Sequence, residues 1–310
     1  MAREIIVGTR ESALAMWQTN WVVDSLKKMN PEYTFQIVSM KTQGDKILDV
    51  ALAKIGDKGL FTKELEAAML NREIDLAVHS MKDLPTVLPE GLTIGAMCER
   101  VDPRDVVISR EGVPLGQLPE GAMIGTSSLR RCAQLLNYRP DLQLEPLRGN
   151  LNTRMAKLER NNLDAIILAA AGVERLGWGD RITERLSIDV CLPAVGQGSI
   201  GIEIREGDQE VSAVVQKINH APTWAAITAE RALLKKLEGG CQIPIGALGT
   251  VDGDQLTLKG VVAGLDGQEL IRDQISGPVA EAAALGVNLA LRLLEMGADK
   301  ILRTVRQETL

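Results

Sequence analysis

The sequence predicts an α/β protein with two doubly wound lobes that face a cleft, followed by a small α+β domain. Up to residue 205, short apolar strands alternate with amphipathic helices, a pattern that favours two parallel, doubly wound sheets. Two segments with proline, 99–104 and 191–197, interrupt the series and look like crossings between the lobes. After 219–222 the pattern changes again. Two crossings imply a hinge between the lobes.

The first lobe starts with an apolar strand over 4–8 and an amphipathic helix that carries Leu14, Trp17 and Leu26 at helical spacing. The other elements expected in this lobe are a helix over 62–71 and strands over 33–40, 74–78, 92–97 and 199–205. Because the last of these strands follows the return crossing, we expect residues 1–98 and 199–218 to form one lobe.

The second lobe, expected over 104–192, contains apolar strands near 106–109, 122–126 and 164–169. The third unit, expected over 222–310, has a helix over 223–237, two or three alternating strands and a helix over 279–296. Between its first helix and first strand, two glycines precede Cys241, and glycine permits the positive φ that would present this thiol to solvent. The alternative is a tight turn with an incidental cysteine.

Composition excludes several classes of function. The net charge of −6 and the pI near 5.2 argue against nucleic acid and against an anionic membrane surface as partners. The longest apolar run, 165–173, is far shorter than the ~20 residues that span a bilayer, and the first residues do not resemble a signal peptide. The four cysteines, Cys98, Cys132, Cys191 and Cys241, show no metal-site spacing. We therefore expect a soluble, cytoplasmic protein with free thiols and no metal.

The segment 125–154, GTSSLRRCAQLLNYRPDLQLEPLRGNLNTR, concentrates positive charge in an acidic protein. It holds five arginines, no lysine and two acids. A guanidinium binds a carboxylate or phosphate through two parallel hydrogen bonds, which lysine cannot do. The arginines follow strand ends beside Gly, Ser, Thr and Asn, where ligands bind in open α/β sheets. The segment thus predicts a site for a ligand with several acidic groups, although a solvated basic face is the alternative.

Two further segments lie at the predicted cleft. Lys82 and Asp83 follow a buried strand, and Pro85 predicts that they lie on a tight, extended loop. There a carboxylate can act as an acid or base or stabilise a cation, although a surface ion pair is the alternative. The loop 41–61 carries Lys54 and Lys58 and is long enough to be a lid over an anion or a merely solvated loop. His79 is expected to be a packed core residue.

Taken together, these segments resemble the porphobilinogen deaminase (hydroxymethylbilane synthase) family over essentially the whole chain. The resemblance is carried by TRESALA (9–15), GDKGLFTKELE (56–66), VHSMKDLP (78–85), GTSSLRR (125–131), LRGNLNTR (147–154), LPAVGQG (192–198) and LEGGCQIPIG (237–246). It implies two lobes similar to periplasmic-binding-protein-like domains. It also implies stepwise deaminating condensation of porphobilinogen into the linear tetrapyrrole hydroxymethylbilane for haem biosynthesis, by a monomer that hands its product to the next enzyme.

The resemblance also implies roles for individual residues. Asp83 would be the catalytic carboxylate, and Cys241 would carry a covalent dipyrromethane cofactor through a thioether. The residues implied to bind the cofactor are Asp45, Lys82, Thr126, Ser128, Arg130, Arg131 and Arg154. The residues implied to bind substrate are Arg10, Ser12, Gln18, Arg148 and Arg175. Lys54, Lys58 and Phe61 would belong to the lid. The runner-up hypothesis is a two-lobed protein that binds an organic anion without catalysis.

Overall fold

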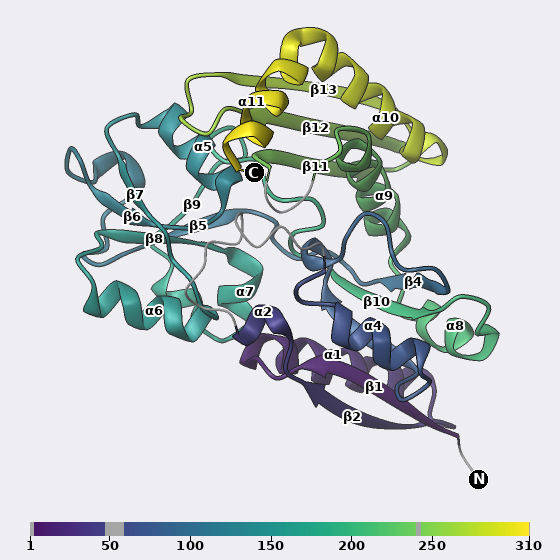
Figure 1. Cartoon of the computed structure of the whole chain (residues 1–310). Helices are drawn as coiled ribbons and strands as arrows, with labels where there is room; N and C mark the ends of the chain where they lie inside the picture. The colour runs from purple at the N-terminus through teal and green to yellow at the C-terminus, as the bar shows by residue number, and fades with distance from the viewer. Residues whose placement is uncertain (1–2, 47–58, 240–242, 310) are drawn as a thin grey trace.

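A computed structural model describes residues 3–46, 59–239 and 243–309 (Figure 1). These residues form three sheets, two in the lobes and one in the C-terminal unit, which lies above the two lobes in the view of Figure 1. The predicted class, two α/β lobes and a small α+β domain, is confirmed. In the part of the chain described, no helix combines the length and apolar character needed to cross a membrane.

The first lobe is built on a sheet of order β2-β1-β3-β10-β4. Its strands are β1 (Glu4–Arg10), β2 (Thr34–Met40), β3 (Leu76–Ser80), β4 (Leu92–Met97) and β10 (Ile200–Arg205), and its helices are α1 (Ala13–Met29), α2 (Gln43–Lys46), α4 (Lys63–Leu70) and α8 (Gln209–Gln216). Helix α1 begins at Ser12, whose hydroxyl accepts a hydrogen bond from the N–H of Ala15, and it buries Val22 and Leu26. The predicted return of 199–205 to this sheet is confirmed.

The second lobe has a sheet of order β7-β6-β8-β5-β9. Its strands are β5 (Asp105–Ser109), β6 (Met123–Gly125), β7 (Gln143–Glu145), β8 (Ala165–Ala169) and β9 (Glu184–Arg185), and its helices are α5 (Leu129–Tyr138), α6 (Leu151–Arg160) and α7 (Ala170–Arg175), with short 3₁₀ turns η2 (Leu115–Gln117) and η3 (Gly179–Arg181). Apolar clusters fill both faces of this sheet, including Val107 and Ile124 on one face and Ile108 and Ile166 on the other.

The prediction of two parallel sheets is wrong for one described strand in each lobe. β10 runs antiparallel to both β3 and β4, and β5 runs antiparallel to both β8 and β9. The pairs β1–β2, β1–β3, β6–β7 and β6–β8 are parallel as expected. The reversed strands are those that follow the two crossings. Each enters its sheet from the other lobe without a helical connection on its own sheet, so its direction is not fixed by a right-handed crossover.

The C-terminal unit packs helices on an antiparallel sheet of order β11-β12-β13. Its elements are α9 (Ala221–Lys236), β11 (Ile245–Asp252), β12 (Gln255–Ala263), β13 (Leu270–Pro278), the 3₁₀ turn η4 (Val279–Glu281), α10 (Ala282–Leu293), the π-helical turn η5 (Leu294–Ala298) and α11 (Asp299–Thr309). It contacts both lobes. Arg231 donates to the carbonyls of Leu84 and Pro85 at 3.2 and 2.6 Å, and Asn137 donates to the carbonyl of Gly267 at 2.8 Å.

A buried ion pair joins the C-terminal unit to the crossings. Arg100, on the outgoing crossing, donates to both carboxylate oxygens of Glu230 at 2.7 and 3.0 Å. Glu230, which is 0% exposed, also accepts hydrogen bonds from the backbone N–H groups of Gly196 on the return crossing and Gly249 on β11. One carboxylate therefore holds together three segments that are distant in sequence.

We predict that Glu230→Ala lowers the free energy of unfolding by about 3–5 kcal/mol, because it leaves Arg100 buried without its partner charge. Urea unfolding followed by circular dichroism measures this loss. Glu159→Ala is the control: Glu159 and Arg181 form an exposed pair at 2.8 Å, and such pairs contribute less than about 1 kcal/mol. Equal losses in the two variants would contradict the assigned role of Glu230.

Candidate active site

Two parallel strands of the first lobe end side by side and bring Arg10 close to Asp83. β1 ends at Arg10 and β3 at Ser80, with Asp83 in the turn after it. Nη1 of Arg10 lies 4.0 Å from Oδ2 of Asp83, and its guanidinium lies 4.3 Å from the ring centre of Phe61. These residues line a pocket together with Ser12 and Gln18. Five residues singled out by resemblance thus meet in one place.

The prediction that Lys82 and Asp83 lie on an extended loop is wrong. Residues Met81–Asp83 form a 3₁₀ turn, and Leu84 alone is extended, with φ −75° and ψ 127°. Pro85 restricts only the residue directly before it, so the turn can form one position earlier. The turn sends the two side chains to different partners. Lys82 donates to the side-chain oxygen of Gln197 at 3.4 Å, while Asp83 faces Arg10.

The predicted strand-to-helix turns of the second lobe are confirmed. Ser128 caps α5, since its hydroxyl accepts from the N–H of Arg131, and Asn150 caps α6. The hydroxyl of Thr126 in turn accepts from the N–H of Ser128 at 3.3 Å. Each hydroxyl uses a lone pair in these bonds and keeps its O–H as a donor. The same turns can therefore be held in place and donate to an anion.

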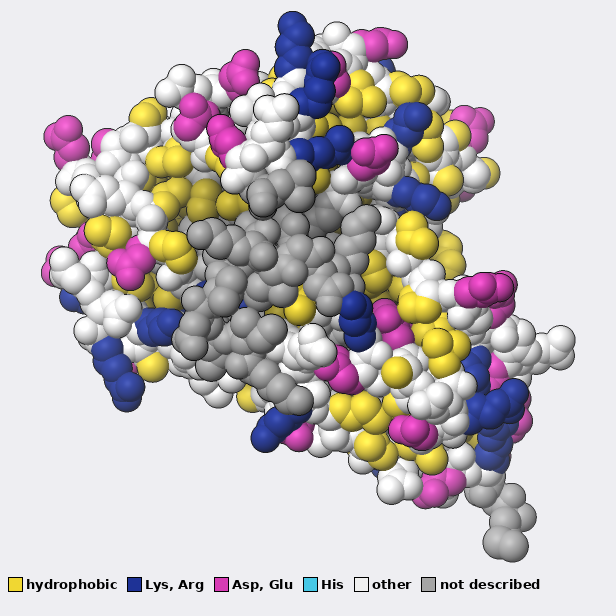
Figure 2. Space-filling view, in the orientation of Figure 1, with side chains coloured by type: hydrophobic (Ala, Val, Ile, Leu, Met, Phe, Trp, Pro, Cys, Tyr) yellow, Lys and Arg dark blue, Asp and Glu magenta, His cyan; other side chains and the backbone are white. Residues whose placement is uncertain are grey.

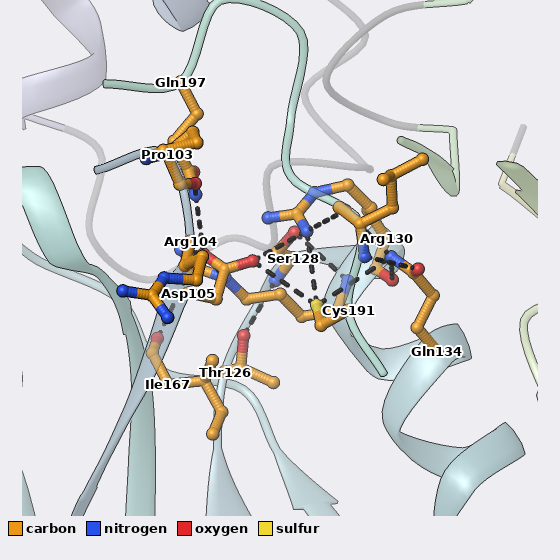
Figure 3. A network of polar contacts seen from close by, with 12 residues as sticks. Pro103, Arg104, Asp105, Thr126, Ser128, Arg130, Gln134, Ile167, Cys191 and Gln197 are labelled. Atoms are coloured by element: carbon orange, nitrogen blue, oxygen red, sulfur yellow. Dashed lines mark hydrogen bonds and ion pairs between the residues drawn. The ribbon is translucent and has the colours of Figure 1, made fainter. Parts of the chain in front are cut away.

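A buried carboxylate that the sequence analysis missed, Asp105, holds two of the predicted arginines. Its two oxygens each lie 2.7 Å from a guanidinium nitrogen, Nη2 of Arg131 and Nη1 of Arg130. Asp105 also accepts from Nε2 of Gln197 at 2.9 Å and from the thiol of Cys191 at 3.4 Å (Figure 3). The two guanidinium groups hold the pKa of Asp105 well below its usual range, despite complete burial. The sequence offered one indication of this buried acid, namely an aspartate at the start of the apolar run DVVIS (105–109).

The cations at the meeting of the lobes outnumber this carboxylate. Burial, with Arg131 nearby, lowers the pKa of Lys82 to about 8, and burial beside Arg131 and Arg148 lowers the pKa of Arg154 to about 10. Burial alone lowers the pKa of Arg148 and is the main cause that lowers that of Arg175 to about 10. Each lowered pKa means that burial disfavours the charged form of the group, and a carboxylate bound beside it would favour the charged form again.

Arg154 and Arg175 are held by backbone carbonyls. Nε of Arg154 donates to Gly149 at 2.9 Å, and Nη2 of Arg175 donates to Gly198 on the return crossing at 2.8 Å. Arg175, which belongs to the second lobe, also lies 5.7 Å from the ring centre of Trp17 in the first lobe. On the face drawn in Figure 2, basic and acidic side chains are intermixed over the described residues.

Some of the predicted site residues lie outside the described residues, namely Cys241, Lys54, Lys58 and the side chain of Asp45. The approach to Cys241 is described as far as Gly239, and Gly240, the second of the two glycines, lies outside the described residues. The left-handed residue is Glu238, with φ 52°, and not Gly239. A Cβ at position 239 would lie 2.4 Å from Cδ1 of Leu234, so that side chain would have to move to admit any other residue. His79 is a packed core residue as expected, 4% exposed and 3.0 Å from Glu203.

Comparison with known proteins gives two family matches. The model "Porphobilinogen deaminase, dipyromethane cofactor binding domain" matches residues 5–213, and "Porphobilinogen deaminase, C-terminal domain" matches 224–295. Proteins named porphobilinogen deaminase from Pelotomaculum thermopropionicum and Carboxydothermus hydrogenoformans are 62% and 63% identical over 308 residues, 99% of each chain. The periplasmic aliphatic sulphonate binding protein SsuA from Escherichia coli aligns over 76% of this chain and 70% of its own, with TM-score 0.40 and 16% identity.

The fold and the site define a two-lobed enzyme for a multiply anionic ligand. The chain belongs to the porphobilinogen deaminase family, whose activity is that of hydroxymethylbilane synthase. It condenses porphobilinogen stepwise on a dipyrromethane cofactor in tetrapyrrole synthesis, which rules out the alternative of a binding protein without catalysis. The described residues fit this cofactor, since pyrroles that each carry two carboxylates match partly buried cations, Lys82 and Arg154, whose pKa values are lowered.

We predict that Cys98, Cys132 and Cys191 resist alkylation in the native protein at about pH 8. Burial raises the pKa of Cys98 and Cys191 to about 12 and that of Cys132 to about 11, so very little reactive thiolate is present. Iodoacetamide labelling followed by peptide mass spectrometry measures this, and the urea-unfolded chain provides the fully labelled control. Labelling of native Cys191 at the rate of the unfolded chain would contradict the prediction.

Proposed function

We propose that Asp83 is the catalytic carboxylate and that the pocket beside Arg10 and Phe61 is where porphobilinogen reacts. The observation that carries this proposal is the loose pairing of Asp83, whose side chain is 31% exposed and 4.0 Å from Nη1 of Arg10. A carboxylate paired at this distance keeps the capacity to face a second cation. The lining of the same pocket by Ser12 and Gln18 supplies polar partners for a substrate.

Asp83 acts on charge that develops at the substrate. When the bond between the methylene carbon and the departing ammonia breaks, the pyrrole becomes a cation, and a fixed carboxylate in a shielded pocket stabilises it. Formation of the new carbon–carbon bond neutralises this cation and moves the positive charge to the attacking pyrrole, and Asp83 accepts the α-proton whose loss restores that ring. The cofactor, when bound, supplies the pyrrole chain on which the product is built.

We propose that the cofactor and the substrate are bound by the cationic and polar side chains that the family resemblance singles out. We assign the cofactor to Asp45, Lys82, Thr126, Ser128, Arg130, Arg131 and Arg154, the substrate to Arg10, Ser12, Gln18, Arg148 and Arg175, and the lid to Lys54, Lys58 and Phe61. The lowered pKa values of Lys82 and Arg154 support the assignment, because both groups gain by pairing with an acid. Phe61, stacked on Arg10, links the lid to the pocket.

Cys241 is the proposed attachment point of the cofactor. Thioether formation needs a reactive thiol, and burial raises the pKa of Cys98, Cys132 and Cys191 far above that of a free thiol. Gly239, two positions before Cys241 in the sequence, packs against Leu234 in the C-terminal unit. A covalent anchor retains the growing chain between condensation steps.

The remaining assignments concern the organisation of the protein. We assign residues 1–98 with 199–218 to the first lobe, 104–192 to the second and 222–310 to the C-terminal domain, supported by the membership of the three sheets. We further propose a cytoplasmic monomer that passes its product to the next enzyme of the pathway. The free thiols of Cys98, Cys132 and Cys191 support a reducing compartment.

Asp83→Asn should fold and keep the covalent cofactor but lose about 10²–10³ in turnover, because it removes the negative charge opposite the cation and preserves shape. Ammonia release from porphobilinogen gives the rate, and intact mass gives the cofactor content. Asp24→Asn, an exposed change on α1, is the matched control and should keep full activity. Near-normal turnover in Asp83→Asn would reject the assigned role.

Cys241→Ser should lose the cofactor and the turnover together, because the hydroxyl is a much weaker nucleophile than a thiol at neutral pH. The native protein should be heavier than its sequence by two linked pyrrole units that survive denaturation and thiol reductant. Cys132→Ser is the matched control and should keep the added mass. An adduct that persists in Cys241→Ser would place the anchor elsewhere.

A further inference from the structure

We propose that Asp105 is a positioning residue that holds Arg130 and Arg131 in the orientation that receives the ligand's carboxylates. The inference rests on the cofactor-binding role proposed above for these two arginines. Asp105 itself is 0% exposed and contacts no ligand in this scheme. It acts through the two guanidinium groups, each within 2.7 Å of one of its oxygens.

The charge balance indicates that Asp105 stabilises Arg130 and Arg131, and not the reverse. One guanidinium is enough to neutralise one carboxylate, yet Asp105 is paired with two, so the buried cluster carries one positive charge in excess. Burying an uncompensated charge costs several kcal/mol. The arginines are therefore not there to satisfy Asp105. The arrangement makes sense if Asp105 offsets part of their repulsion and an incoming acid supplies the rest.

The hydrogen bonds of Arg131 leave a defined part of its guanidinium for a ligand. Nε and Nη2 both donate to Oδ1 of Asp105, at 3.1 and 2.7 Å, and Nη1 donates to the carbonyl of Ile167 at 2.9 Å. These bonds use three of the five N–H groups of a guanidinium. They fix the plane of the group, so the two N–H groups that meet no acceptor among the described residues point in fixed directions.

Arg130 is fixed in a similar way from the return crossing. Its Nη1 donates to the carbonyl of Leu192 at 2.7 Å and to the sulfur of Cys191 at 3.3 Å, in addition to Asp105. Gln134 donates to the same carbonyl of Leu192 at 3.1 Å and accepts from the N–H of Leu192 at 2.8 Å. The crossing and α5 are thus joined around the guanidinium of Arg130 (Figure 3).

Gln197 connects this cluster to the first lobe. Its amide nitrogen donates to Asp105 at 2.9 Å and to the carbonyl of Pro103 at 2.7 Å, while its amide oxygen accepts from Nζ of Lys82 at 3.4 Å. Both crossings and both lobes therefore meet at one buried side chain, which is 1% exposed. Asp105 is held in position by the hinge and in turn holds the arginines.

The test compares Asp105→Asn with Asp75→Asn in the full-length enzyme. Asp75 is a matched control: it pairs with Arg205 at 2.8 Å and accepts from the N–H of Ile6 in the first lobe, away from the site. Three quantities are measured: the fraction of molecules carrying the cofactor by intact mass, kcat per loaded molecule with KM for porphobilinogen, and the melting temperature.

We expect Asp105→Asn to reduce the loaded fraction or kcat per loaded molecule by about tenfold or more, because a displacement of about 1 Å in a binding group can cost up to about 10²-fold. Asp75→Asn should change the melting temperature alone. The inference fails if Asp105→Asn loads and turns over normally, or if Asp75→Asn shows the same loss of loading and kcat.

Two further variants complete the design. If Asp105→Asn does not fold, Asp105→Glu decides, because it keeps the negative charge and leaves the contact of Gln197 with Lys82 in place but displaces the carboxylate that orients both guanidinium groups. A reduced loaded fraction supports the inference and an unchanged one overturns it. Arg131→Lys distinguishes the positioning role of Asp105 from the cofactor-binding role proposed for the arginines. Normal loading in Arg131→Lys rejects the cofactor role of the arginine, and with it the inference. Impaired Arg131→Lys beside normal Asp105→Asn rejects only the positioning role.

Discussion

The structure depends on an excess of positive charge buried where the lobes meet. Lys82, Arg131 and Arg154 lie close enough for burial and mutual repulsion to lower the pKa of Lys82 and Arg154. Removing such charges from water costs several kcal/mol per ion unless partners supply the lost interactions. One carboxylate, Asp105, supplies part of this compensation. In the proposed scheme, the ligand's acidic groups supply the remainder, and the affinity for a polyanion then follows from how the protein folds.

A site of this kind needs a rigid surrounding structure, and the two segments that cross between the lobes, 99–104 and 191–197, provide it. Both segments between the lobes are tied to buried acids: Arg100 and the N–H of Gly196 to Glu230, and the carbonyl of Pro103 to Asp105 through Gln197. The strand that follows each crossing is also the reversed strand of its sheet. The hinge is therefore continuous with the sheet cores, and the C-terminal domain is fastened to it by Glu230.

The sequence predicted the fold class and the strand ends that carry the site, because apolar runs followed by Gly, Ser or Thr mark both. It could not predict the reversal of β5 and β10, since a strand's side-chain pattern carries no direction. The sequence analysis also missed Asp105, which lies in an apolar run. Its partner Arg131, which compensates the cost of burying its charge, is 26 positions away in the sequence. The extended loop at Lys82 was wrong because the restriction imposed by Pro85 acts on Leu84 alone.

Asp105 and Asp83, two aspartates near the cleft, differ in their surroundings and therefore in the charges they can interact with. Asp105 is fully buried and accepts hydrogen bonds on both oxygens, so it has no capacity for another cation. Asp83 is partly exposed, and the guanidinium of Arg10 lies 4.0 Å from its carboxylate, beyond hydrogen-bond distance. Environment thus separates two chemically identical groups into different roles, as it does in other enzymes with paired carboxylates. In the proposed scheme, Asp105, whose two oxygens are already paired, organises the arginines. Asp83, which is loosely paired, stabilises the cation that forms and disappears at each condensation.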